Sequence, residues 1–287
     1  MIVPPELESS LKKHASQKQF PDNTPYLSLS INSSSHLSAK FNLNLQQIEI
    51  VALQNDIIPE HYARNMRFFS VEDQIALLNS QVGVVGLGGL GGAVSEILAR
   101  IGIGRLVLFD GDMFEESNLN RQLLSTTDVL DSSKADAAKL RVAEVNPSIL
   151  CRSHAEYIDE TNATDLLAKT DVIVDCLDNI KTRFVVEHTA KQMGVPFISA
   201  AVAGFSGQIT TIFPEDQGLK LIYGAIEDDV PSKGAETALG TLAPVVTTLA
   251  SLECAEVVKI ILGRGTPLRN RLLIVDLLDN TFEVLTL

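Results

Sequence analysis

The residues best suited to chemistry begin with a run of glycines in Gln81–Gly92, QVGVVGLGGLGG. Gly86, Gly88 and Gly91 have the G-x-G-x-x-G spacing of a nucleotide-phosphate loop. Glycine allows a tight turn, a close approach of the backbone to phosphate, and close packing of helix on strand. The N-terminus of the following helix would offer unpaired N–H groups to an anion. The same pattern also occurs in ordinary strand-to-helix turns, so the chemistry must be argued from other residues.

A second group of polar residues fills Asp110–Gln122, DGDMFEESNLNRQ. An acid about twenty residues beyond a glycine loop, as Asp110 is, suits a ribose hydroxyl. Further along the chain come Lys134, the pair Asp178-Asn179, and Arg183. Phosphoryl chemistry needs this mixture, with cations for the phosphates and a carboxylate for Mg²⁺. No G-x-x-x-x-G-K-[ST] segment is present, which excludes a P-loop enzyme.

The elements that must position these residues alternate between apolar strands and amphipathic helices. Ligands in such α/β sheets bind at the carboxyl ends of the strands, so the glycine loop, Asp110 and Asp178 should converge there. The pattern predicts a mostly parallel sheet with helices on both faces and antiparallel strands at the C-terminus. The predicted strands are 82–85, 105–109, 171–176, 196–200, 207–213, 272–276 and 281–285, and the predicted helices are 90–100, 133–145 and 242–262.

Residues 1–59 differ in character from residues 60–287, and we predict them to be an N-terminal appendage to one large domain. The alternation at 26–31 and 41–45 predicts strands, and the serine-rich stretch 32–36 predicts a turn between them. The appendage could be a hairpin or a flexible arm. The following segment, 59–78, predicts two helical pieces, the second starting at Ser70 with Asp73 three residues later.

Composition limits the classes of function. The 287 residues carry a net charge of −13, which argues against nucleic-acid binding because phosphate neutralisation needs clustered Lys and Arg. No apolar run is long enough for a membrane helix and no secretory signal is visible, so we expect a soluble, cytoplasmic protein. Cys151, Cys176 and Cys254 form no C-x-x-C pair, and Cys176 and Cys254 each suit a small core position.

Taken together, GLGGLG, D-x-D…SNLNRQ, Lys134 and DCLDN…R resemble the ThiF/MoeB/HesA family of adenylyltransferases related to ubiquitin-activating enzymes. The resemblance covers residues 60–287. It implies a Rossmann-like domain, usually homodimeric, that uses MgATP to adenylate a C-terminal carboxylate. The usual substrate is a ubiquitin-like sulfur carrier ending in Gly-Gly, as in molybdenum or tungsten cofactor or thiamine synthesis.

The resemblance also implies roles for individual residues. Asp110 would bind the ribose, Asp178 would hold Mg²⁺, and Arg121 would stabilise charge on the α-phosphorus. Arg64 would be an arginine finger supplied by the partner subunit of a homodimer, while His61 stands where the family has a further arginine. The remaining nucleotide ligands would be Gly86, Gly88, Gly89, Asn118, Gln122, Lys134 and Asn179. Asp112 and Arg183 could belong to the site or to the scaffold, and Asp175 is expected to be structural.

One part of the family pattern is missing. Many members carry two C-x-x-C zinc pairs and a cysteine in a crossover loop, but the corresponding stretch 230–240, VPSKGAETALG, has no cysteine. We therefore expect no zinc and no covalent thioester or acyl-disulfide step through this loop.

Three alternatives remain open from the sequence. A nicotinamide-dependent oxidoreductase would use the glycine loop and Asp110 but would leave SNLNRQ and Lys134 without a role. An adenylyltransferase could act on another carboxylate, such as a peptide C-terminus or a modified tRNA nucleoside. A non-catalytic subunit is disfavoured by the presence of Arg64, Arg121, Lys134 and Asp178.

Overall fold

The centre of the molecule is an eight-stranded sheet, seen in a computed structural model that describes residues 4–224 and 234–287. The strand order is β11-β10-β9-β8-β7-β4-β5-β6. Pairing is parallel from β8 through β7, β4 and β5 to β6, and antiparallel from β8 through β9 and β10 to β11. The predicted fold class is confirmed. The strands are β4 (Gln81–Val85), β5 (Arg105–Phe109), β6 (Leu150–His154), β7 (Val172–Asp175), β8 (Phe197–Ala203), β9 (Ser206–Ile212), β10 (Arg271–Asp276) and β11 (Thr281–Thr286).

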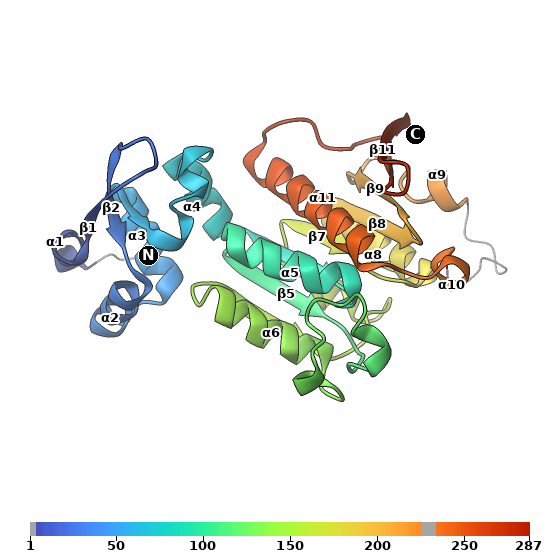
Figure 1. Cartoon of the computed structure of the whole chain (residues 1–287), viewed down its shortest axis with the longest axis horizontal. Helices are drawn as coiled ribbons and strands as arrows, with labels where there is room; N and C mark the ends of the chain where they lie inside the picture. Colours follow the sequence, from blue (N-terminus) through green and yellow to red (C-terminus); the bar gives the residue numbers. More distant parts are fainter. Residues whose placement is uncertain (1–3, 225–233) are drawn as a thin grey trace.

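Both faces of the parallel strands are buried. Successive side chains of a strand point to opposite faces of the sheet, so each strand contributes to two apolar clusters. Val84 and Leu108 belong to one apolar cluster, while their neighbours Val85 and Phe109 belong to another. The first cluster lies under α5 (Gly89–Ile101), α6 (Lys134–Val145) and α11 (Ala243–Leu262), which Figure 1 shows side by side on one face. The second cluster is covered by α7 (Ala163–Leu166), α8 (Ile180–Met193) and α9 (Lys220–Tyr223).

Strand β4 lies at the point where the strand order of the sheet reverses, with β5 and β6 added on one side and β7 and β8 on the other. It has β5 on one side and β7 on the other, and both pair with it in parallel. The loops that leave the carboxyl ends of these strands therefore separate and open a crevice, which is where α/β sheets bind their ligands. The glycine loop follows β4, the Asp110 segment follows β5, and Asp178 follows β7.

The N-terminal residues form a small sheet of their own, in the order β1-β2-β3, at one end of the molecule (Figure 1). Its elements are α1 (Pro5–His14), β1 (Ser16–Gln19), β2 (Pro25–Leu29), α2 (Ile31–Phe41), α3 (Leu45–Gln54) and β3 (Ile57–Pro59). Strands β1 and β2 pair as an antiparallel hairpin, and β2 pairs with β3 in parallel. This hairpin is not the one predicted from the sequence, since only the predicted strand at 26–31 overlaps an observed strand, β2.

Two predictions within this region are wrong. The stretch 32–36 is not a turn but the first half of α2, which Ser30 caps by accepting a hydrogen bond from the Ser33 N–H at 3.1 Å. The stretch 41–45 is not a strand. It joins α2 to α3 through Asn42, whose φ of 52° ends the first helix in the left-handed conformation. The serines suggested a turn because they favour both turns and helix caps.

The segment that joins the small sheet to the large one contains the turns η1 (Glu60–Tyr62) and η2 (Asn65–Arg67) and helix α4 (Val71–Asn79). The predicted start of α4 is confirmed, since Ser70 and Asp73 form a reciprocal capping box. The junction is packed, with Ile50, Leu53, Tyr62 and Leu78 in one buried cluster. No helix in the described residues is long and apolar enough to cross a membrane.

Candidate active site

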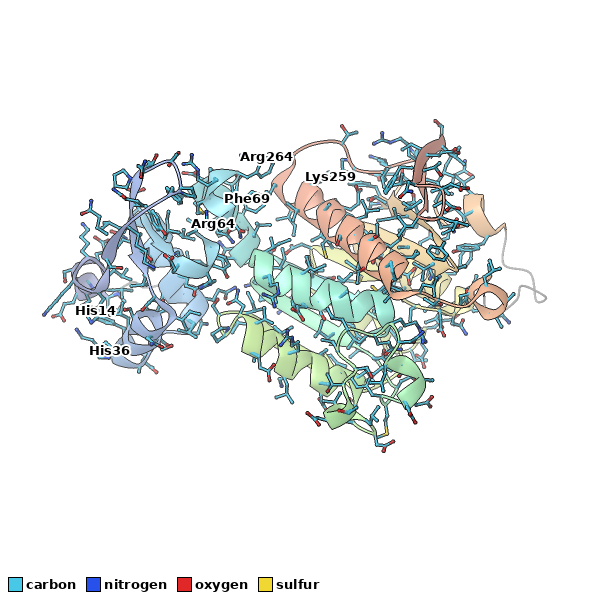
Figure 2. All side chains as sticks on the ribbon, viewed as in Figure 1. His14, His36, Arg64, Phe69, Lys259 and Arg264 are labelled. Atoms are coloured by element: carbon cyan, nitrogen blue, oxygen red, sulfur yellow. The ribbon has the colours of Figure 1, made fainter. Side chains whose placement is uncertain are left out.

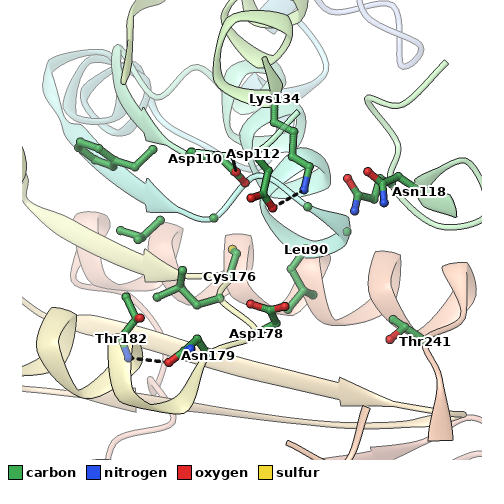
Figure 3. A pocket seen from close by; sticks show the side chains of 18 of the residues that line it. Leu90, Asp110, Asp112, Asn118, Lys134, Cys176, Asp178, Asn179, Thr182 and Thr241 are labelled. Atoms are coloured by element: carbon green, nitrogen blue, oxygen red, sulfur yellow. Dashed lines mark hydrogen bonds and ion pairs between the residues drawn. The ribbon is translucent and has the colours of Figure 1, made fainter. Parts of the chain in front are cut away.

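A cavity of about 910 Å³ opens at the carboxyl ends of β4, β5 and β7. Its walls include the glycine loop, the segment after β5, the start of α6 and the start of α8. Figure 3 shows Lys134 and Asp112 on one side and Asp178 and Asn179 on the other. The predicted residues that line it are Gly86, Gly88, Gly89, Asp110, Asn118, Arg121, Gln122, Lys134, Asp178 and Asn179.

The glycine loop is shaped by close contacts that only glycine permits. Gly86 has a φ of 88°, and a Cβ there would lie 2.8 Å from the carbonyl oxygen of Cys176. A Cβ on Gly91 would overlap the carbonyl oxygen of Gly86. Gly88 differs, because the nearest atom to a Cβ there is Nε2 of Gln122 at 3.5 Å, on the cavity side. The backbone at Gly88 can thus be approached closely by a ligand. Helix α5 starts at Gly89, one residue earlier than predicted.

Asp110 is held at the end of β5 by two backbone donors. The Leu87 N–H donates to Oδ2 at 2.6 Å, and the Asp112 N–H donates to Oδ1 at 2.8 Å. Burial raises the pKa of this carboxyl above its usual value, while the two N–H donors oppose that shift. The side chain therefore ties the glycine loop to the β5 loop. This position suits a carboxylate that accepts a hydroxyl hydrogen from a ligand in the cavity.

Lys134 is a buried cation that lines the cavity. Its Nζ donates to Asp112 Oδ2 at 2.9 Å, and Asp112 Oδ1 accepts from the Tyr157 hydroxyl at 2.6 Å. The Lys134 side chain is only 8% exposed, whereas Asp112 is 48% exposed. Asp112 thus belongs to the site as a partner of Lys134. Tyr157 also lines the cavity, and its ring covers Gly111, where a Cβ would lie 2.7 Å from the ring.

The SNLNRQ segment brings three polar side chains to the cavity. Asn118 is buried and accepts from the Glu115 N–H at 3.1 Å, which closes the turn η3 (Glu116–Asn118). Arg121 Nη1 donates to the Ser117 carbonyl at 3.0 Å and remains partly exposed. Gln122 Oε1 is buried, and within the described residues it has no hydrogen-bond partner. Such a group is costly to bury unless a ligand or water completes its bonding.

Across the cavity, the segment after β7 supplies Asp178 and Asn179. Asn179 caps α8, accepting from the Thr182 N–H at 3.1 Å. Asp178 is exposed at this edge. Behind it, Arg183 and Asp175 form a buried pair at 3.1 Å. Arg183 also donates to the carbonyl of Leu177, so this pair fixes the backbone next to Asp178 and serves the scaffold.

The donor set fits ATP with magnesium. The open backbone at Gly88, the N-terminus of α5, and the cations Lys134 and Arg121 suit a polyphosphate. The Asp178 carboxylate is a ligand that Mg²⁺ prefers, with phosphate oxygens as the usual further ligands. In the described residues, no group of three or more His, Cys, Asp or Glu side chains is placed to hold a metal ion. A magnesium ion at Asp178 would therefore depend on ligands from the nucleotide.

Arg64 lies away from this cavity. It is exposed between η1 and η2, among the N-terminal elements (Figure 2). The neighbouring Tyr62 packs against Gly102 at the C-terminal end of α5, whereas the glycine loop lies at its N-terminal end. The 13 residues of α5 span about 20 Å at 1.5 Å per residue. His61 faces Glu49 of the N-terminal region, 3.4 Å away.

The predicted crossover loop, 230–240, lies partly outside the described residues, which resume at Gly234. Two residues around its end, Glu236 and Thr241, line the cavity and were not predicted from the sequence. Among the cysteines, Cys254 is buried as expected, while Cys176 is half-buried and lines the cavity. Burial raises the pKa of the Cys176 thiol well above its usual value, with the charge of Glu253 adding to the effect.

Comparison with known proteins agrees with this geometry. The model of the ThiF family matches residues 62–287. The chain belongs to the ThiF family. It is 33% identical over 229 residues to the SAMP-activating enzyme E1 of Haloferax volcanii, covering 78% of this chain and 83% of that protein. It is 34% identical to the sulfur carrier protein ThiS adenylyltransferase of Escherichia coli, covering 69% and 78% of the two chains.

A third relative is the adenylyltransferase and sulfurtransferase MOCS3 of Drosophila grimshawi, which is 36% identical over 229 residues. The match covers 78% of this chain but only 50% of MOCS3. Among solved structures, E. coli MccB with ATP shares the fold with a TM-score of 0.67 and 24% identity, covering 100% of this chain and 89% of that one. This ThiF-family chain is thus an ATP-binding adenylyltransferase, which argues against the oxidoreductase alternative.

Proposed function

We propose that this enzyme uses MgATP to adenylate the C-terminal carboxylate of a polypeptide, with release of pyrophosphate. The observation that carries the proposal is the single cavity in which a glycine loop, Lys134, Arg121 and Asp178 meet. Each of these groups alone has an ordinary structural explanation. Their convergence at the carboxyl ends of three neighbouring strands suits a bound triphosphate with its metal ion.

The proposed roles follow from position. The backbone of Gly86, Gly88 and Gly89 would receive phosphate, and Asp110 would accept a ribose hydroxyl. Arg121 and Lys134 would neutralise phosphate charge. Asn118, Gln122 and Asn179 would complete the polar lining by binding the nucleotide. Asp178 would hold Mg²⁺, directly or through water, and the metal would supply further charge neutralisation.

Catalysis in this proposal needs no general base, because a carboxylate is already ionised near pH 7. One carboxylate oxygen attacks the α-phosphorus in line with the departing pyrophosphate. The enzyme contributes positioning and charge neutralisation at the phosphorus. In the free enzyme, the ion pair with Asp112 aims Lys134 into the cavity, so its ammonium group needs little reorganisation when phosphate arrives.

Arg64 would act from the partner subunit of a homodimer. Its place beyond the far end of α5, about 20 Å from the glycine loop, excludes direct contact with a triphosphate in the same chain. His61 faces Glu49 inside the N-terminal region, with Nε2 3.4 Å from Oε1. For this reason we do not assign His61 the nucleotide contact that an arginine makes elsewhere in the family.

The first candidate substrate is a ubiquitin-like sulfur carrier with a Gly-Gly tail. The supporting observation is the similarity to enzymes named for SAMP and for ThiS, at 33% and 34% identity. Because stretch 230–240 contains no cysteine, we propose that the acyl-adenylate is released or handed on without a covalent step in this loop. We also propose a cytoplasmic location, as expected from the sequence.

The second candidate substrate is a peptide. The family model begins at residue 62, whereas the MccB fold match extends over the whole chain, including the small N-terminal sheet. One of the matched structures is MccB with N-formylated MccA, and it covers 88% of this chain at a TM-score of 0.69. The N-terminal region that contains β1, β2 and β3 would then hold the body of the peptide while its tail enters the cavity.

The test is a product analysis with purified enzyme, ATP and Mg²⁺. Candidate carriers and peptides should each be offered with an intact tail and with the last two residues removed. The proposal predicts pyrophosphate and an acyl-adenylate, which water then hydrolyses to AMP and the free carboxylate, only with an intact tail. Formation of ADP and phosphate, or equal turnover of the intact and truncated substrates, would contradict it.

A further inference from the structure

The segment that carries Arg64, residues 60–67, is held from two sides, and we call it the finger segment. On the inner side, Tyr62 is fully buried, and its hydroxyl accepts from Asn146 Nδ2 at 2.8 Å. Asn65 Nδ2 donates to the carbonyl of the last residue of α5 at 3.2 Å. These contacts fix the backbone of the finger segment to the large domain on either side of Arg64.

On the outer side lies the antiparallel pair of β1 and β2, residues 16–29, which we call the N-terminal hairpin. The Glu60 carboxylate meets three donors from it. Oε2 accepts from Ser28 Oγ at 2.5 Å and from the Tyr26 hydroxyl at 3.1 Å, and Oε1 lies 2.9 Å from Lys18 Nζ. Burial by itself would raise the pKa of Glu60, but the hydrogen bonds from the hairpin outweigh it and leave that pKa below its usual value. A single exposed ion pair contributes little to stability, whereas this carboxylate is shared by donors from both strands.

The hairpin also holds the other end of the finger segment. The guanidinium of Arg67 forms an ion pair with Asp22, in the turn between β1 and β2, and its Cζ lies 5.0 Å from the centre of the Phe20 ring. Phe20 in turn stacks on Tyr26, with ring centres 4.2 Å apart. The hairpin therefore contacts the finger segment on both sides of Arg64.

The Arg64 side chain itself is exposed and lies close to the hairpin (Figure 2). Burial, and next the hydrogen bond to Glu60, raise the pKa of Tyr26, while the nearby charge of Arg64 opposes that shift. A long arginine side chain loses rotamer freedom when it binds a phosphate. A mobile backbone would add to this cost, so contacts that fix the finger segment favour binding by Arg64.

We infer that the N-terminal hairpin holds Arg64 in the position from which it reaches the nucleotide of the partner subunit, with Glu60 as the main positioning residue. The inference rests on the proposed function, in which Arg64 of one subunit acts on the triphosphate in the other. Glu60 acts only through Arg64 and touches no part of the nucleotide. Its removal should therefore weaken binding of the phosphates that Arg64 contacts and leave the rest of the nucleotide site unchanged.

The test is calorimetric binding of MgATP, and of AMP, which lacks the two phosphates that leave, to the full-length enzyme. Glu60→Gln keeps the size of the side chain and removes its charge. It should weaken ATP binding about 3- to 30-fold, as expected for coupled neighbouring residues, and leave AMP binding unchanged. Glu8→Gln, at an exposed position of α1, is the matched control and should keep both affinities. All variants are compared at a concentration at which sedimentation shows the same oligomer as the unmodified enzyme.

A double-mutant cycle connects this effect to Arg64. Arg64→Ala should weaken ATP binding about 10- to 100-fold, as loss of a hydrogen bond to a charged group does, and adding Glu60→Gln should weaken it no further. Asp22→Asn, which removes the charge that pairs with Arg67 at the other end of the finger segment, should show the same pattern. It serves as the second test if Glu60→Gln does not fold.

Three results would overturn the inference while leaving the proposed function intact. The first is unaltered ATP affinity in Glu60→Gln when Arg64→Ala binds ATP weakly. The second is an equal loss of ATP and AMP affinity in Glu60→Gln, and the third is additive losses in the double variant, since both indicate a general structural role. Unaltered ATP affinity in Arg64→Ala would instead contradict the role of Arg64 in the proposed function, and the inference with it.

Discussion

Arg121 is the residue on which the proposed chemistry depends most directly. It lines the cavity and keeps a partly exposed guanidinium, anchored by the Ser117 carbonyl at 3.0 Å. We expect Arg121→Ala to lose about 3–4 kcal/mol of transition-state stabilisation, or roughly 10²–10³ in kcat, by analogy with removal of an oxyanion donor. The measurement is the rate of pyrophosphate release at saturating ATP. Arg152→Ala, which removes an exposed arginine outside the cavity, should stay near the unmodified rate; equal rates in both variants would refute the assignment.

Glu253 gives a prediction about pH. This carboxyl on α11 is fully buried, and Oε1 has no partner in the described part of the chain. Burial, and next the charge of Asp175, raise its pKa well above the usual value. A raised folded-state pKa means that the folded protein binds the proton more tightly than the unfolded chain. The associated stability is therefore complete below the unfolded pKa of about 4.3 and is lost as the pH rises towards the folded pKa.

Glu253→Gln removes this titration. We expect the free energy of unfolding to fall less between pH 5 and pH 8 in this variant than in the unmodified protein, as measured by urea denaturation at several pH values. Glu283→Gln, on the exposed strand β11, is the matched control and should keep the original pH dependence. Parallel stability curves for Glu253→Gln and the unmodified protein would show that the buried carboxyl is not protonated.

At the residue level, the sequence predicted the side chains that stand in recognisable motifs. Asp110 could be proposed from its distance to the glycine loop, and Asn118, Lys134 and Asp178 from motifs that resemble those of the ThiF family. Their placement in one cavity agrees with that proposal, although their roles remain predictions. Tyr157, Glu236 and Thr241 could not be predicted, since Tyr157 and Thr241 lie in loops and Glu236 starts the short helix α10 (Glu236–Leu239), all of whose positions depend on tertiary packing.

At the level of elements, the strand β4, the glycine loop and helix α5 act as one unit. Gly91→Ala should destabilise the fold by about 3 kcal/mol or more and abolish ATP binding, because a Cβ would overlap the Gly86 carbonyl oxygen. Chemical denaturation and calorimetric ATP titration check this. Gly194→Ala is the matched control: its φ is +71° but nothing lies within 4 Å of a Cβ, so it should cost about 1 kcal/mol and leave ATP affinity unchanged. Unaltered ATP binding by Gly91→Ala would contradict the close-packing argument.

The elements that the sequence predicted well have long apolar patterns. Strands β4, β5 and β7 and helix α11 are of this kind. Strand β6 was not predicted, because it lies at the edge of the sheet and its residues, LCRSH, are only partly buried. Helix α2 was mistaken for a turn between strands because its first residues are mostly serine and asparagine, with only Ser34 and Leu37 buried.

At the level of the whole molecule, the position of Arg64 requires a second subunit if it is to reach a nucleotide. A homodimer with two equal sites would then use residues from both chains at each site. Arg64→Ala and Arg121→Ala should each be nearly inactive, but their equimolar mixture should recover about a quarter of the activity. Half of the dimers would be mixed, and each would have one intact site. The measurement is pyrophosphate release after subunit exchange, and no recovery in proven mixed dimers would exclude action in trans.

The most direct test of the central claim is ATP–pyrophosphate exchange, which reports reversible formation of an acyl-adenylate. A polypeptide substrate should be compared with the same molecule carrying a C-terminal amide, which removes the attacking carboxylate and leaves the rest unchanged. Exchange that requires the free carboxylate, and that falls by the same large factor in Arg121→Ala, is the predicted result. Exchange that continues with the amidated tail, or that is insensitive to Arg121, would contradict the claim that this cavity joins a C-terminal carboxylate to the α-phosphorus of ATP.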